Sequence, residues 1–192
     1  MPDVPRVTTI LSTIFPITID PARLVLAQQR GTAVHRACEL LDGGGDGSGL
    51  DVESLDPSWK PYVAAYQRFL TDTGFRVTDI ETPVRSVRYG YTGTPDRVGL
   101  LDGKPVLLDL KTGVPWPTVA LQTAAYAEAW KEQSRERTLR RRAALYLRAD
   151  ATYGLTFCED REDFKRFTAC LVLYRWLAKE GKDGDRRTVD KR

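Results

Sequence analysis

Apolar residues recur three and four positions apart in four stretches of the chain, the spacing that places them on one face of a helix. Start and stop signals flank the first two stretches. Asp20 is a candidate N-cap ahead of Pro21, and a glycine-rich run follows Leu41. Pro57 opens the second stretch and Gly74 ends it. We predict helices over residues 21–41, 57–74, 114–133 and 160–180.

Between the second and third helices the apolar residues alternate with polar ones, as they do on strands. Three antiparallel strands are predicted over 75–90, 91–101 and 104–113. The dipeptide Asp102–Gly103 separates the last two and is a strong signal for a tight hairpin turn. The segments 141–150 and 152–160 also alternate and predict two further strands. This order of elements predicts a single α/β domain with a mixed sheet over residues 1–180.

Residues 181–192 form a polar, basic tail that lacks the apolar residues needed to fold. In the chain as a whole, hydrophobic residues make up 42% of the 192 positions, which is enough for a substantial core. The formal net charge is only +3, so charge alone does not indicate a nucleic-acid partner. The partner must be inferred from the candidate site.

The three cysteines, Cys38, Cys158 and Cys170, are odd in number and far apart, which favours a reducing compartment. No apolar run is long enough to span a bilayer, and the first ten residues lack the features of a signal peptide. We expect a cytoplasmic protein without a membrane partner.

The chemistry concentrates in Asp109-Leu110-Lys111. On a strand the first and third residues project from the same face, so a carboxylate and an ammonium meet at one place. Across the Asp102–Gly103 hairpin, the register of the neighbouring strand can bring Asp96 beside Asp109. Two carboxylates this close repel each other unless a cation lies between them, and oxygen ligands suit Mg²⁺ or Mn²⁺.

Such an ion can bind a phosphate oxygen and activate a water for attack on phosphorus. Lys111 would orient or help to deprotonate that water, or stabilise the leaving charge. Taken alone, an Asp-x-Lys pattern is more often a strand that ends in a surface salt bridge. The interpretation as a site therefore depends on the other motifs of the chain.

The sequence TPD, a short spacer and DLKTG resemble the PD-(D/E)XK nuclease superfamily, and specifically the branch similar to the nuclease domain of the bacterial RecB recombination enzyme. Two other motifs of that branch are matched. Gly31 and His35 match its GxxxH motif, and Gln122 and Tyr126 match its QxxxY motif. The resemblance covers roughly residues 31–126 and implies a restriction-endonuclease-like core, a mixed sheet flanked by helices.

The resemblance also implies roles for individual residues. His35, Asp96, Asp109 and the Leu110 carbonyl would bind the metal, and Lys111 would act on the water. Glu81 occupies the place of an assisting glutamate in many members. Gln122 and Tyr126 lie on one helical face, where they would hold a DNA phosphate or support the active site. Taken singly, His35 would be an ordinary polar helix residue and Tyr126 a core residue.

Two departures from this branch matter. Its CRISPR-associated members bind an iron–sulfur cluster through four cysteines, whereas this chain has three without that spacing, so we predict no cluster. A GxxxxGK[ST] helicase motif is also missing from the sequence, so any unwinding activity must come from another chain.

Other residues have two interpretations each. Glu39 is either a partner that orients His35 or a solvated glutamate. The basic residues Arg140 to Arg142, and Arg186, Arg187, Lys191 and Arg192 of the tail, either contact phosphates or keep the surface soluble. Trp116 either stacks on an unpaired base or packs against the protein.

The sequence thus predicts a metal-dependent deoxyribonuclease, more specifically an exonuclease in recombination, repair or phage DNA processing. A single-strand annealing protein would be a natural companion, and a ring-shaped homo-oligomer would make it processive. One alternative is an inactive DNA-binding or assembly protein that retains the fold. Another is an enzyme that acts on RNA or a structure- or sequence-specific endonuclease, for which no recognition domain is visible.

Overall fold

The computed structural model describes residues 4–43, 50–134, 139 and 141–189, without the side chains of 181–189. Its elements follow the predicted order of helices, strands, a helix, strands and a helix. They are α1 (Val7–Ile14), α2 (Pro21–Gly43), a short 3₁₀ helix (Val52–Ser54), α3 (Lys60–Thr73), β1 (Arg76–Ile80), β2 (Val84–Ser86), β3 (Tyr91–Gly93), β4 (Arg97–Leu101), β5 (Lys104–Lys111), α4 (Thr118–Gln133), β6 (Arg141–Leu147), β7 (Tyr153–Phe157) and α5 (Asp163–Val189).

The main sheet has five strands in the order β1-β4-β5-β6-β7. Strands β5 and β6 are parallel and their connection contains α4, whereas the other neighbouring pairs are antiparallel. The prediction of an α/β fold with a mixed sheet flanked by helices is confirmed. Because β5 is the central strand, its residues 106–110 are buried.

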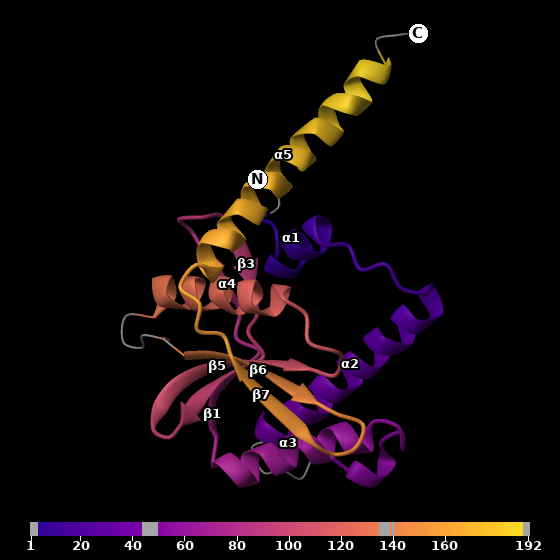
Figure 1. The fold of residues 1–192 in the computed structure, drawn as a ribbon, viewed down its shortest axis with the longest axis vertical. Coiled ribbons are helices and arrows are strands. Elements are labelled where there is room, and N and C mark those ends of the chain that lie inside the picture. Colours follow the sequence, from indigo (N-terminus) through magenta and orange to yellow (C-terminus); the bar gives the residue numbers. More distant parts are fainter. Residues whose placement is uncertain (1–3, 44–49, 135–138, 140, 190–192) are drawn as a thin grey trace.

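Helices cover both faces of this sheet, with α4 on one side and α3 on the other (Figure 1). On β5, Leu107 packs into the apolar cluster on the α4 side, and Leu110 packs into the cluster on the α3 side. Side chains alternate along a strand, so Asp109 and Lys111 share the face of Leu107. The two candidate residues therefore point toward α4.

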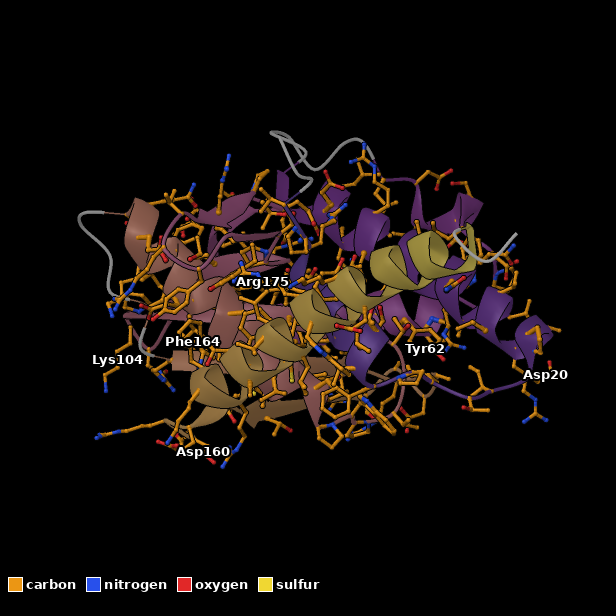
Figure 2. All side chains as sticks on the ribbon, turned by 90° about the horizontal axis from the view of Figure 1, so that it is seen from above. Asp20, Tyr62, Lys104, Asp160, Phe164 and Arg175 are labelled. Carbon is orange, nitrogen blue, oxygen red and sulfur yellow. The ribbon has the colours of Figure 1, made fainter. Side chains whose placement is uncertain are left out.

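The hairpin between β4 and β5 forms where the sequence predicts it. Leu101 pairs with Lys104, and Asp102 and Gly103 both have positive φ, 53° and 71°, as a two-residue turn of this kind requires. The predicted helix start at Asp20 is also correct, because its carboxylate accepts a hydrogen bond from the Arg23 amide at 3.1 Å. Seen from above, Asp20 at the helix start and Lys104 of the hairpin lie at opposite sides of the molecule (Figure 2).

Two of the predicted strands are each two shorter strands in the structure. Segment 75–90 is divided into β1 and β2, since Glu81 has a positive φ of 45° and Pro83 follows it. Segment 91–101 is divided into β3 and β4 at Pro95. Strands β2 and β3 form a separate hairpin that contacts α4, so alternation alone did not show that the chain leaves the main sheet between β1 and β4.

The helices differ from the prediction mainly at their ends. Helix α1 was not predicted, although Val7, Ile10 and Leu11 follow helical spacing and are buried. Helices α3 and α4 begin three and four residues later than predicted, because prolines occupy their entry segments. The predicted glycine-rich loop falls mostly on residues 44–49, which lie outside the described part.

Helix α5 runs from Asp163 to Val189 and therefore continues past residue 180, where we predicted an irregular polar tail. The backbone of 181–189 extends the preceding helix, so local hydrogen bonding continues it even though the sequence there is polar. Within the described part of the chain, no helix combines the length and apolar character that crossing a bilayer requires.

Candidate functional site

The candidate site is built around the main chain of Leu110, close to the end of β5. The Leu110 amide donates a hydrogen bond to Asp96 Oδ2 at 2.6 Å. Its carbonyl accepts one from His35 Nε2 at 2.9 Å. One residue of the central strand thus joins the GxxxH helix α2 to the segment that precedes β4.

Asp96 lies directly before β4 and not on it, which refines its predicted place on a strand. The register pairs Arg97 with Leu108, so the next step of the ladder sets Asp96 opposite Asp109. The ladder itself ends at Arg97 and Leu108, so the arrangement of the two carboxylates side by side stays a prediction. Both side chains are almost fully buried.

Three donors converge at this place. One ligand atom each from His35, Glu81 and Asp96 lies within 4.8 Å of the other two. His35 Nδ1 is 3.5 Å from Asp96 Oδ1. Two carboxylates, an imidazole and the neighbouring Leu110 carbonyl are a donor set that fits a divalent cation, with the oxygens favouring Mg²⁺ or Mn²⁺. Glu81, expected only to assist, is the third member of this group.

Asp109 lies beside this group and is held by two other side chains. Its Oδ1 accepts a hydrogen bond from Gln122 Nε2 at 2.8 Å, and its Oδ2 is 2.6 Å from Lys111 Nζ. Asp109 is buried, whereas the Lys111 side chain is partly exposed at the edge of the site. Lys111 therefore presents an ammonium group at the boundary between the buried carboxylates and the solvent.

Burial raises the pKa of Asp109 to about 6, and the charge of Asp96 adds to this effect while Lys111 opposes it. Burial would also raise the pKa of Asp96, but its hydrogen bond and charge interaction with His35 outweigh burial and lower it. For His35, burial lowers the pKa, but the hydrogen bond and the charge of Asp96 outweigh burial, so the pKa of His35 is raised overall. The two aspartates are thus driven apart in their affinity for a proton.

Gln122 connects the site to the core under α4. Its Nε2 also lies 3.0 Å from the Tyr126 hydroxyl, one helical turn further along. Tyr126 is only 3% exposed, and a Cβ atom added to Gly93 would overlap its ring. Of the two roles that the sequence left open, this burial favours support of the active site by Tyr126 over contact with DNA.

A buried arginine next to Asp96 was missed. Arg97 is fully buried and its Nε donates to Asp42 Oδ2 at 2.6 Å, while one terminal nitrogen donates to the Asp96 carbonyl at 2.6 Å. The same nitrogen is 3.5 Å from Glu81 Oε1. The signal in the sequence was a charged residue within the otherwise apolar strand 97–101.

The remaining candidates lie at the margin of the site or away from it. Glu39 pairs with Arg36 at 2.6 Å, in agreement with a solvated glutamate and not with a partner of His35. Trp116 is 46% exposed and forms part of a cavity of about 470 Å³ together with Tyr146, which pairs in register with Lys111. It is thus available for contact with a substrate.

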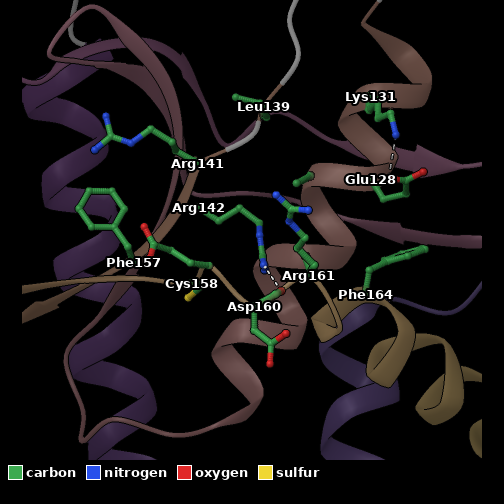
Figure 3. Close-up of a pocket in the computed structure, with 13 residues that line it drawn as sticks. Glu128, Lys131, Leu139, Arg141, Arg142, Phe157, Cys158, Asp160, Arg161 and Phe164 are labelled. Atoms are coloured by element: carbon green, nitrogen blue, oxygen red, sulfur yellow. Dashed lines mark hydrogen bonds and ion pairs between the residues drawn. The ribbon is translucent and has the colours of Figure 1, made fainter.

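Of the basic run at 140–142, the structure describes Arg141 and Arg142, and both make contacts within the protein. Arg142 donates to the Ala120 and Asp160 carbonyls and pairs with Asp163 at 3.0 Å. Figure 3 shows its guanidinium directed toward Asp160 in a cavity of about 710 Å³. Arg141 lies over the ring of Phe157. Neither the interpretation as phosphate contacts nor that as solubilising residues fits Arg142, while Arg140 and the tail side chains lie outside the described part.

No protein-family model matches the sequence, and a search of curated proteins finds no match. Among solved structures, LHK-Exo in complex with dAMP is similar, with a TM-score of 0.52 and 14% identity over 97% of this chain and 93% of the other. A second structure, of the alkaline exonuclease LHK-Exo from Laribacter hongkongensis, has a TM-score of 0.47 and 13% identity over 82% and 92%. The structure of SSO0001 has a TM-score of 0.42 and 12% identity over 89% of this chain and 84% of the other. The likeness to the dAMP complex shows that this chain shares the fold of LHK-Exo.

Proposed function

We propose that this protein is a divalent-metal-dependent deoxyribonuclease of the PD-(D/E)XK superfamily, in its RecB-like branch, and that it acts as an exonuclease. The observation that carries the proposal is the convergence of His35, Glu81 and Asp96, with His35 and Asp96 hydrogen-bonded to the main chain of Leu110, which the paired Asp109 and Lys111 flank on β5. These residues come from α2, the segment after β1, the segment before β4, and β5. A chance salt bridge at a strand end would need none of the contacts from α2.

In this proposal His35, Asp96, Asp109 and the Leu110 carbonyl hold Mg²⁺ or Mn²⁺, and Glu81 assists from the same cluster. A bound ion of this type neutralises a phosphate oxygen and lowers the pKa of a water. The chain itself contributes the geometry. The Leu110 amide fixes the Asp96 carboxylate, and Gln122 fixes that of Asp109, so neither ligand needs to reorient when DNA arrives.

Lys111 completes the catalytic group. Its ammonium is 2.6 Å from Asp109 and partly exposed, so it can reach a water or a phosphate oxygen beside the carboxylates. A cation at this position orients the attacking water and stabilises the charge that develops on phosphorus or on the leaving oxygen. Tyr126 supports the site through Gln122 and does not itself touch DNA.

Trp116 is proposed as a contact for an unpaired base. It follows the DLKTG segment by a few residues and lies, half-exposed, beside the buried Tyr146. An exposed aromatic face that shares a cavity with Tyr146, the register partner of Lys111, suits stacking of a terminal base, which requires no particular sequence. This placement favours activity at DNA ends and supports an exonuclease over a sequence-specific endonuclease.

The wider setting is also a proposal. LHK-Exo is named an alkaline exonuclease, and the match to its complex with dAMP covers 97% of this chain and 93% of the other. We propose a single nuclease domain over 1–180 that works in the cytoplasm in recombination, repair or phage DNA processing, together with an annealing protein and as a homo-oligomer. Cys38, Cys158 and Cys170 lie on α2, after β7 and on α5, a distribution that does not favour an iron–sulfur cluster.

The test is a time course with end-labelled linear DNA and closed circular DNA, in Mg²⁺, in Mn²⁺ and in chelator, with Asp109→Ala as the control. Loss of linear DNA alone, dependent on the metal and absent in the variant, is the expected result. Cleavage of the circle would identify an endonuclease instead. Binding of DNA without cleavage of either form would favour a non-catalytic binding protein.

A further inference from the structure

Next to the donor group of His35, Glu81 and Asp96 lies a buried ion pair that has no role in the proposed reaction. Arg97 and Asp42 have side chains that are 0% and 3% exposed, and Nε and Oδ2 are 2.6 Å apart. Asp42 Oδ2 also accepts a hydrogen bond from the Tyr66 hydroxyl at 2.6 Å. One carboxylate oxygen therefore joins α2, α3 and β4 at a single point.

The position of this pair relates it to the metal donors. Asp42 follows His35 by seven residues on α2, which is about two helical turns, so both side chains lie on the same side of the helix. Arg97 follows Asp96 directly, donates to its carbonyl, and has the same nitrogen 3.5 Å from Glu81. The amide of Glu81 also donates to the Asp96 carbonyl, at 3.1 Å. Arg97 therefore contacts Asp96 and Glu81 directly, and it is linked to His35 through Asp42 on the same helix.

We propose that Arg97 and Asp42 are a positioning pair that sets the spacing of His35, Asp96 and Glu81 for the metal ion. This inference rests on the proposed function. The pair fixes α2, and with it His35, against the start of β4. It also holds the Asp96 carbonyl and the Glu81 carboxylate on the same guanidinium, so the three donors cannot shift independently.

The type of residue matters for this role. A buried ion pair contributes little net stability compared with apolar residues of similar size, because both charges lose their hydration. Its particular property is direction, since the planar guanidinium donates along fixed axes to several acceptors at once. A lysine would keep the charge but would not reach Asp42, the Asp96 carbonyl and Glu81 together.

The experiment measures Mn²⁺ binding by electron paramagnetic resonance, without DNA, for the wild type, Arg97→Lys and Asp42→Asn. A matched control is Arg142→Lys, which alters a second buried arginine–aspartate pair that makes contacts to α4 and Asp163. Thermal melting in chelator reports stability for each variant. We expect Mn²⁺ affinity to fall about tenfold or more in Arg97→Lys and Asp42→Asn, the usual size of effects behind metal ligands, and to be unchanged in Arg142→Lys.

Stability alone would not produce this pattern, since Arg142→Lys should also lower the melting temperature. Wild-type Mn²⁺ affinity in a folded Arg97→Lys protein would overturn the inference and leave the proposed function intact. A wild-type protein that binds no Mn²⁺ would overturn the proposed function itself. Should Arg97→Lys not fold, Tyr66→Phe removes one hydrogen bond to Asp42, and we expect a smaller but measurable loss of Mn²⁺ affinity; an unchanged affinity would count against the pair.

Discussion

Gln122 Nε2 donates a hydrogen bond to Asp109 Oδ1 at 2.8 Å, and this contact joins helix α4 to the carboxylate on the central strand. It brings the QxxxY and DxK segments into contact although α4 starts seven residues after β5 ends. The amide leaves the other carboxylate oxygen to Lys111. Asp109 is therefore oriented from two sides before any ligand binds.

Replacing Gln122 tests this orientation. Gln122→Ala leaves Asp109 Oδ1 without its donor, so we expect kcat on linear DNA to fall about tenfold, as is typical when a partner of a metal ligand is removed. Gln133→Ala is the control, because Gln133 is the exposed last residue of the same helix, where it accepts a hydrogen bond from the Arg85 amide. Equal activity of the two variants would show that the hydrogen bond from Gln122 does not contribute to cleavage.

Lys111→Ala should abolish cleavage and leave DNA binding largely intact. Removal of one charge-stabilising donor from an active site typically costs about a hundredfold or more in kcat. The assay follows cleavage of linear DNA, with binding measured separately by fluorescence anisotropy in Ca²⁺. Lys104→Ala is the matched control, because Lys104 is an exposed lysine at the other end of the same strand. Cleavage by Lys111→Ala at the wild-type rate would exclude Lys111 from the mechanism.

Gly93 is a test of the packing beneath the site. A Cβ at this position would overlap the Tyr126 ring, so Gly93→Ala should lower the free energy of unfolding by about 1–3 kcal/mol, the usual cost of overpacking. Gly113→Ala is the comparison, because a Cβ there would have no atom within 4 Å. Chemical denaturation measures both. If the two variants were equally stable, the ring of Tyr126 would have room to move away from Gly93.

The sequence predicted those parts of the site that depend on short-range spacing. The two-residue interval between Asp109 and Lys111 and the turn at Asp102–Gly103 follow from strand and hairpin geometry, so the positions of these residues relative to Asp96 could be anticipated. The mixed α/β fold followed in the same way from the order of helical and alternating segments.

Long-range contacts could not be anticipated in this way. The pairing of Arg97 with Asp42 joins residues 55 positions apart, and spacing along the chain contains no information on it. The alternation in 75–101 predicted strands correctly but did not show that β2 and β3 separate from the main sheet. Glu81, at a positive φ just after β1, enters the donor cluster through a local bend that no periodicity signals.

Trp116→Ala should weaken binding to DNA with a single-stranded end. Loss of one base-stacking aromatic costs about 1–3 kcal/mol of binding free energy, and we expect little change on blunt duplexes, where no unpaired base is present. Trp176→Ala is the control, because Trp176 is 56% exposed on α5 and is not among the residues that form the Trp116 cavity. Equal weakening on both kinds of DNA would indicate a general contribution of Trp116 to the surface and not a stacked base.

The raised pKa of Asp109 makes the stability of the protein depend on pH and on bound metal. The pKa of Asp109 is raised to about 6 in the folded protein, whereas the carboxyl of an unfolded chain ionises near 3.8. The folded state therefore binds this proton more tightly, so the stability that Asp109 contributes is present below pH 3.8 and is lost as the pH rises through about 6.

In chelator, the melting temperature of the wild type relative to Asp109→Asn should fall between pH 4.5 and 7. Added Mn²⁺ replaces the proton as the partner of the carboxylate, so the stabilisation by Mn²⁺ should grow over the same interval. A difference between wild type and variant that stays constant with pH would show that Asp109 ionises in the fold as it does in the unfolded chain.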